Sequence, residues 1–224
     1  MAVQLLEKTD HYLLGIWKMD EDEAELLQVL GLTEPLTQTN RVRRQEFLSV
    51  RAMALEMGIK PSEIAYFPSG KPYLVNKKLT ISISHTKNYV AVLLSNHELA
   101  GVDVEQCTDR VRKIRHKFMH SDEEAWLKQI TNPISEKGGH QQITKPINET
   151  VGLLLHWCAK ESLFKAVVED GVDFVQELRI KEFLPLDVSG RFKGVFLRTG
   201  RSFEIDYRIQ PDFVLTCSFS EESK

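Results

Sequence analysis

Two carboxylates alternate at the end of an apolar run in the segment AGVDVE, residues 100–105. Residues two apart in a strand point to the same face, so Asp103 and Glu105 project together while the valines beside them point into the core. Two neighbouring carboxylates repel each other unless they are protonated, solvated or bridged by a cation. A hard ion such as Mg²⁺, which takes oxygen ligands, suits this pair. A solvated strand end is the common alternative for so short a motif.

A third acid lies in the segment WCAKESLFKA, residues 157–166. Trp157, Glu161 and Lys165 recur every four residues, so they share one face of a predicted helix. An exposed Glu–Lys pair is the alternative, and it contributes only about 0.2–0.5 kcal/mol. This helix is otherwise strongly apolar, however, which favours a half-buried position beside a cleft. We therefore predict that Glu161 completes a three-acid metal site and that Lys165 can neutralise a phosphate.

Two long helices are predicted from the spacing of apolar residues. The first covers residues 40–58 and stops at Gly58, and the second covers residues 151–170 and stops at Gly171. Strands are predicted between and after them, from alternating or continuous apolar runs. These runs are 70–75, 79–84, 89–95, 99–105, 177–186, 192–199, 202–209 and 213–220.

The strands at 89–95 and 99–105 are predicted to form a hairpin, with Asn96 and His97 near its turn. The clearest strand is SFEIDYRI, residues 202–209, because its alternate apolar residues fall on one face. Those residues are Phe203, Ile205, Tyr207 and Ile209.

The order of elements predicts an α+β fold of two similar halves, each a long helix packed on a small antiparallel sheet, as in a pseudo-dimer. The residues show no internal repeat, so this duplication is an argument from the pattern of elements alone. We place the N-terminal half at residues 1–105 and the C-terminal half at 106–224. Residues 131–150, rich in Gly, Pro and polar residues, form a loop. A loop this long is either functional or disordered.

Composition narrows the class of protein. The 224 residues carry a net charge of −3, which disfavours a protein that grips nucleic acid. Local basic runs at 41–51 and 110–117 suit a small anionic ligand, although a solvated helix face is the commoner explanation. Three widely spaced cysteines favour a reducing compartment over a disulfide framework or a zinc site. With no signal peptide and no apolar stretch of about 18 residues, we expect a cytoplasmic protein without membrane partners.

The acid-bearing segments and three others resemble the signatures of the phosphopantetheinyl transferases, specifically the larger pseudo-dimeric type that activates peptide, polyketide and siderophore synthases. The five segments span roughly residues 43–166, and their order at plausible spacing makes the resemblance specific although each alone is weak. They are GKP (70–72), SISHT (82–86), GVDVE (101–105), FMHSDE (118–123) and WCAKESLFKA (157–166).

The resemblance implies a holo-acyl-carrier-protein synthase. Such an enzyme transfers the 4′-phosphopantetheine arm of coenzyme A to a serine of an apo acyl or peptidyl carrier protein and releases adenosine 3′,5′-bisphosphate. Asp103, Glu105 and Glu161 would hold Mg²⁺, or Mn²⁺, against the pyrophosphate of coenzyme A. Glu161 would also accept the serine proton, directly or through a metal-bound water. Lys165 would contact the phosphates and protonate the departing oxygen.

Further residues are implied at the edge of this site and at the nucleotide. Glu123 corresponds to a family acid near the site, and Asp122 or Glu124 would replace it if the register slips by one. Ser84 and His85 match a contact to the 3′-phosphate of coenzyme A.

Three basic residues complete the implied nucleotide contacts. Lys71 lies in a Gly-Pro turn from which its side chain can reach out. Arg43 and Arg51 are two helical turns apart, hence roughly on one helix face. In related members, arginines at this spacing bind the nucleotide end of coenzyme A, so the resemblance implies the same contact here. A solvated basic face is the alternative, and Arg41 and Arg44 are neighbouring candidates.

Two other classes of function stay open. A non-catalytic module that binds coenzyme A or carrier proteins would keep the same residues without turnover. A Mg²⁺-dependent nuclease is disfavoured, because Cys107 stands where a lysine would follow Glu105 in such a site. We expect a monomer, since the two halves can form the site between them.

Overall fold

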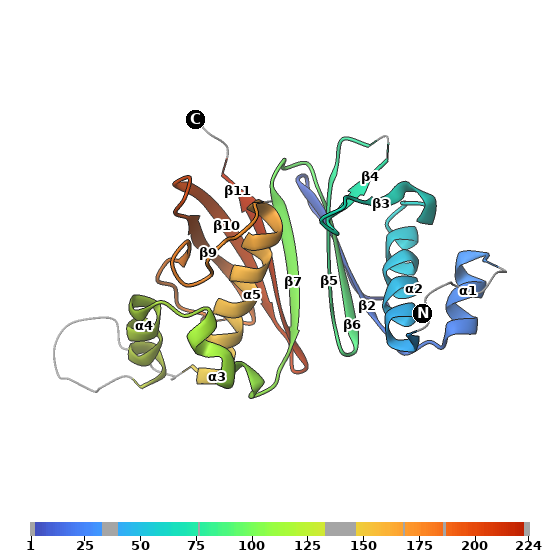
Figure 1. Ribbon diagram of the computed structural model, residues 1–224. Coiled ribbons are helices and arrows are strands. Elements are labelled where there is room, and N and C mark those ends of the chain that lie inside the picture. Colours follow the sequence, from blue (N-terminus) through green and yellow to red (C-terminus); the bar gives the residue numbers. More distant parts are fainter. Residues whose placement is uncertain are drawn as a thin grey trace.

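The computed structural model describes residues 3–32, 40–75, 77–132, 147–167, 169–185 and 187–221, and these form an α+β fold with antiparallel sheets, as predicted (Figure 1). The α-helices are α1 Glu23–Leu30, α2 Arg41–Glu56, α3 Arg110–Ile114, α4 Ser121–Thr131 and α5 Glu149–Val167. Short 3-10 helices cover η1 Pro61–Glu63 and η2 Arg115–Lys117. Most of the predicted loop 131–150 lies outside the described residues.

A four-stranded sheet in the order β1-β2-β6-β5 lies in the N-terminal part of the chain. Its strands are β1 Val3–Lys8, β2 Tyr12–Lys18, β5 Thr80–Thr86 and β6 Tyr89–Ser95. The two-stranded sheet β3-β4 (Ile64–Tyr66 and Pro72–Leu74) accompanies it. Helix α2 begins where the side chain of Asn40 caps the amide of Arg43. Its apolar residues pack on this sheet, including Val50, Ala54 and Met57 as the helical spacing predicted.

A five-stranded sheet in the order β7-β11-β10-β9-β8 lies in the C-terminal part. Helix α5 covers one face of it, and Phe203, Ile205 and Tyr207 of β10 are buried in that core as predicted. The strands are β7 Ala100–Gln106, β8 Leu178–Ile180, β9 Ser189–Phe196, β10 Arg201–Ile209 and β11 Phe213–Ser220.

The two sheets pack against each other through a shared apolar cluster, and the helices α2 and α5 lie on their outer faces (Figure 1). Leu14, Ile16 and Leu93 from the first sheet meet Val102 and Val104 of β7 in this cluster. The valines of the GVDVE motif are thus in the core, as predicted, so the alternate residues of β7 face α5.

The predicted hairpin of residues 89–95 and 99–105 is wrong. Strand β6 pairs with β2 and with β5, and the hairpin is β5–β6, in which Thr86 faces Tyr89. Strand β7 pairs with β11 instead, so Asn96 and His97 lie in a connection that crosses from one sheet to the other. The hydrogen bonds of the C-terminal sheet therefore begin at Ala100, whereas we placed the boundary between the two halves after Glu105.

Among the described residues, no helix is both long and apolar enough to cross a lipid bilayer.

Candidate active site

Strand β7 and helix α5 approach each other closely at Gly101. A Cβ atom at this position would lie 2.0 Å from the carbonyl oxygen of Ser162 and 2.9 Å from the backbone nitrogen of Ala166. Only glycine permits this distance between the backbones. The glycine of GVDVE therefore sets the contact that brings the acids of β7 beside the face of α5 that carries Glu161 and Lys165.

Asp103 is the centre of the polar contacts at this junction and is only 4% exposed. Its Oδ1 accepts hydrogen bonds from Ser84 Oγ of β5 and from Lys165 Nζ, both at 2.7 Å. Lys165 Nζ also donates to Ser84 Oγ at 2.8 Å and to the carbonyl of Val102 at 3.1 Å. Oδ2 of Asp103 is buried and has no hydrogen-bond partner among the described residues.

Glu105 points to the same face of β7, as predicted, and is half-buried. Its Oε1 accepts a hydrogen bond of 2.7 Å from the indole nitrogen of Trp157. Burial raises the pKa of Glu105, and the charge of Asp103 adds to the rise, whereas Trp157 and Lys165 oppose it.

Glu161 completes this group of acids from helix α5. Burial raises its pKa to about 7, and the charges of Asp103 and Glu105 act in the same direction while Lys165 opposes them. These mutual effects show that the three acids share one electrostatic environment. A carboxyl group whose pKa is near neutrality can exchange a proton at physiological pH.

The chemistry of these donors fits a hard divalent cation, because three oxygen donors lie together and Asp103 Oδ2 is buried without a partner among the described residues. The arrangement is not a formed ligand cluster: within the described part of the chain, no set of three or more His, Cys, Asp or Glu side chains is placed to hold a metal ion. In this state Lys165 neutralises Asp103.

Glu123 lies in a different setting from the other predicted residues. It is buried and forms an ion pair of 2.7 Å with Lys160, whose side chain is fully buried. Its two oxygens also accept from the backbone amides of Ile180 and His120, both at 2.8 Å. These contacts hold α4 to the core of the C-terminal half. A catalytic role of Glu123 remains a prediction.

The neighbours of Glu123 face elsewhere. Asp122 is exposed, and Glu124 binds Arg115.

Two adjoining cavities run from Lys165, which pairs with Asp103, toward helix α2. The first, of about 650 Å³, lies between the two halves and is lined by Lys71 and Lys165 among others. The second, of about 770 Å³, is lined by Arg43 and His85. Both share Gly70, Pro72 and Ile83, so they form one groove. The structure therefore brings these four predicted basic residues to a single groove, which Glu46, Glu169 and Asp170 also line.

The predicted phosphate contacts differ in exposure and partners. Lys71 is half-buried, and burial lowers its pKa. His85 is exposed and lies 3.3 Å from Glu46 of α2, an acid that the sequence analysis did not single out. Ser84 is buried and bonded to Asp103 and Lys165, so its hydroxyl supports the acids in this state.

Arg51 is buried beside this groove, where its guanidinium lies 3.2 Å from the centre of the Phe47 ring. Burial lowers its pKa, and an interaction with Tyr66 opposes the effect. No ion pair of Arg51 occurs within the described ranges. A cation without an acidic partner is suited to an anionic ligand.

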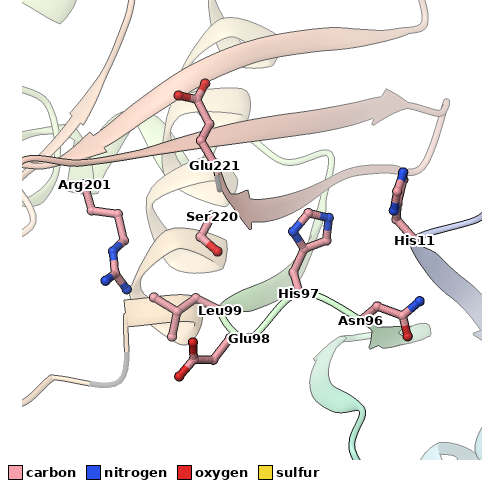
Figure 2. A pocket seen from close by; sticks show the side chains of 8 residues that line it. All are labelled: His11, Asn96, His97, Glu98, Leu99, Arg201, Ser220 and Glu221. Atoms are coloured by element: carbon pink, nitrogen blue, oxygen red, sulfur yellow. The ribbon is translucent and has the colours of Figure 1, made fainter. Parts of the chain in front are cut away.

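A separate pocket of about 440 Å³ lies where the β6–β7 connection meets the ends of β10 and β11. Figure 2 shows Arg201 at one side of it, His11 at the other and His97 between them. It shares no lining residue with the groove. None of the predicted site residues lies in it.

Two functional features were not recognised in the sequence. The hydrogen bond from Trp157 to Glu105 was not predicted, although the spacing of Trp157 from Glu161 placed it on the same helix face. The buried ion pair of Lys160 with Glu123 was not predicted either, and it joins residues 37 apart in the chain. No local pattern predicts such a contact.

A comparison with protein families agrees with this geometry. The sequence model described as the 4′-phosphopantetheinyl transferase superfamily matches residues 100–218, slightly more than half of the chain. The matched range starts at β7 and includes Asp103, Glu105, Glu161 and Lys165. No curated protein matches the chain significantly.

Proposed function

Since the chain belongs to the 4′-phosphopantetheinyl transferase superfamily, as its motifs predicted, we propose that it transfers 4′-phosphopantetheine from coenzyme A to a serine of an apo acyl or peptidyl carrier protein. The observation that carries this proposal is a groove that brings Arg43, His85 and Lys71 together and reaches Lys165, which pairs with Asp103. Such a groove suits a ligand with phosphates at its two ends.

The reaction forms a bond between the serine oxygen and the phosphorus that carries the pantetheine arm, and it breaks the bond to adenosine 3′,5′-bisphosphate. Glu161 accepts the serine proton; in the metal-free chain, burial raises the pKa of this carboxyl to about 7. Lys165, at the end of the groove, donates a proton to the departing phosphate oxygen and offsets its negative charge.

Asp103, Glu105 and Glu161 would hold Mg²⁺, or Mn²⁺ in its place. The cation would supply positive charge to the pyrophosphate as negative charge moves to the leaving group. At the other end of the groove, Arg43, Arg51 and His85 bind the nucleotide and its 3′-phosphate. Lys71 lines the part of the groove that Lys165 also lines. This assignment gives the buried Arg51 an anion to neutralise.

The chain would be of the larger pseudo-dimeric type and act as a monomer in the cytoplasm. Its two long helices, α2 and α5, each pack on an antiparallel sheet, and the groove lies between the two halves. One chain thus supplies both walls of the site. The three free cysteines favour a reducing compartment.

The test is the intact mass of an apo carrier protein after incubation with this protein, coenzyme A and Mg²⁺. We expect a gain equal to one phosphopantetheinyl group, and no gain with EDTA or with Glu161→Gln. The matched control is Glu56→Gln, which removes an exposed acid at the end of α2 and should leave the gain unchanged.

Other outcomes identify the alternatives. Coenzyme A binding without transfer to any of several carriers would favour the binding module. If the protein does not bind coenzyme A at all, the proposed function is wrong.

A further inference from the structure

Both acids of β7 have one oxygen held by a fixed donor and one oxygen left over. Oδ1 of Asp103 accepts from Ser84 and Lys165, and Oδ2 has no partner among the described residues. Oε1 of Glu105 accepts from Trp157, and the described residues offer no hydrogen bond to Oε2. The two carboxylates are therefore prepared in the same way, each with a single oxygen available to a ligand.

Trp157 is a rigid donor because aromatic rings enclose it. The ring centroids of Phe118 and Phe174 lie 5.2 Å and 5.8 Å from that of Trp157. A tightly packed indole keeps its N–H in one direction, and it usually finds a hydrogen-bond acceptor when buried. Here that acceptor is the acid of a neighbouring strand.

Lys160 anchors the backbone of the two residues whose rings pack against Trp157. Its Nζ donates to the carbonyl of Phe118 at 2.5 Å and to the carbonyl of Phe174 at 2.9 Å, and it pairs with Glu123. Contacts thus run continuously from the buried ion pair, through the aromatic rings, to Glu105. Glu123 and Lys160 therefore support Glu105 indirectly, through the residues that pack against Trp157.

We propose that Trp157 is a positioning residue, whose N–H fixes Glu105 so that Oε2 alone is presented to a divalent cation. This inference rests on the proposed function. A carboxylate that is free to rotate could bind the cation with both oxygens or turn toward solvent, whereas a fixed one offers a single oxygen. Outer-shell hydrogen bonds of this kind typically change metal affinity by about 10–100-fold.

The test uses Trp157→Phe, which keeps an aromatic ring between Phe118 and Phe174 and removes the N–H together with part of the ring volume, a loss that the control variant below shares. Free Mn²⁺ is measured by electron paramagnetic resonance during titration of the full chain in the presence of coenzyme A. We expect the dissociation constant to rise about tenfold or more. The matched control is Trp126→Phe, because Trp126 donates its N–H to the carbonyl of Phe183 at 3.0 Å, away from the acids. It should bind Mn²⁺ as the parent protein does.

A second readout follows the indole itself. In spectra of the ¹⁵N-labelled chain, the Trp157 signal is assigned by its loss in Trp157→Phe, and it should shift when Mg²⁺ and coenzyme A are added. The indoles of Trp17, which binds Glu21, and of Trp126 should stay in place.

Equal Mn²⁺ affinity in the two variants, or a Trp157 signal that ignores Mg²⁺, would overturn the positioning role. If the parent chain itself binds no Mn²⁺ and modifies no carrier, the failure belongs to the proposed function instead.

Discussion

At the scale of single residues, the site combines carboxyl groups whose charged forms are disfavoured by burial and by the negative charge of their neighbours. Glu161 is half-buried near two other acids, and only Lys165 among the described residues offsets its charge. Ser84 and Lys165 offset this cost for Oδ1 of Asp103, whereas its buried Oδ2 has no partner among the described residues. The site is thus more costly to fold than an apolar surface would be, as expected of functional groups.

Replacement of Glu161 by Gln should stabilise the metal-free protein at alkaline pH. The folded protein raises the pKa of Glu161 from 4.5 to about 7, so between these values the folded state binds more protons than the unfolded state. The contribution of Glu161 to the unfolding free energy therefore falls as the pH rises from 4.5 to about 7. Above pH 7 the loss of stability from ionising this carboxyl approaches its full value. At about 1.4 kcal/mol per pKa unit, the rise from 4.5 to about 7 sets an upper value of roughly 3.5 kcal/mol for the gain of Gln at pH 8.

The measurement is the unfolding free energy of both proteins in EDTA between pH 4 and pH 8. The difference should vanish near pH 4, where the carboxyl is protonated in both states. A Gln variant no more stable than the parent at pH 8 would contradict the raised pKa.

At the scale of elements, the contact of β7 with α5 determines where the acids meet. Gly101 allows the two backbones to touch, and alternate residues of β7 then face either the helix or the inter-sheet core. The spacing of four residues on α5 places Trp157, Glu161 and Lys165 along that contact. A change in the separation of these two elements would alter every distance in the site.

Gly101→Ala should therefore reduce stability and activity together. Its Cβ would lie 2.0 Å from the Ser162 carbonyl, so the strand and the helix must separate. Overpacking typically costs about 1–3 kcal/mol, and a clash with backbone should reach the upper part of that range. Urea unfolding and the carrier-protein mass assay measure the two effects.

Gly31→Ala is the control for Gly101→Ala. Gly31 ends α1 with a φ of 63°, and a Cβ added there would meet no described residue beyond its chain neighbours within 4 Å. Alanine there should cost about 1 kcal/mol through its backbone conformation and leave transfer intact. Equal effects of the two substitutions would argue against a special contact at Gly101.

At the scale of the whole molecule, the two halves depend on each other. Their sheets share one apolar cluster, and side chains bridge them at its border. Arg208 of β10 pairs with Glu7 of β1, and the hydroxyl of Tyr12 of β2 donates to Asp206 of β10 at 3.3 Å. The groove needs both halves as well, since Lys71 and Lys165 line it from opposite sides.

Residues 100–224 expressed alone should consequently fail to fold cooperatively. Separation from residues 1–99 would expose the cluster face that includes Val102, Val104 and Leu215. We expect weak near-ultraviolet circular dichroism and binding of a hydrophobic dye, with both corrected when residues 1–99 are co-expressed. A fragment with a sharp thermal transition and no dye binding would show that each half folds by itself.

Local patterns in the sequence predicted the α+β class, the helices α2 and α5, most strands of the C-terminal sheet and the superfamily. Periodicity suffices for these elements because a helix or strand repeats its buried positions at a constant interval. The motifs suffice for the family because Asp103, Glu105, Glu161 and Lys165 each lie in a short segment of definite spacing.

Only the tertiary structure decided which strands pair and what surrounds each acid. Strand β7 pairs with the distant β11 rather than with β6, because its valines complete a core between two sheets. Lys160 finds Glu123, and Trp157 finds Glu105 52 residues away, through the packing of α5 on that sheet. Periodicity is blind to such contacts, since it records which face of an element is buried but not what lies against that face.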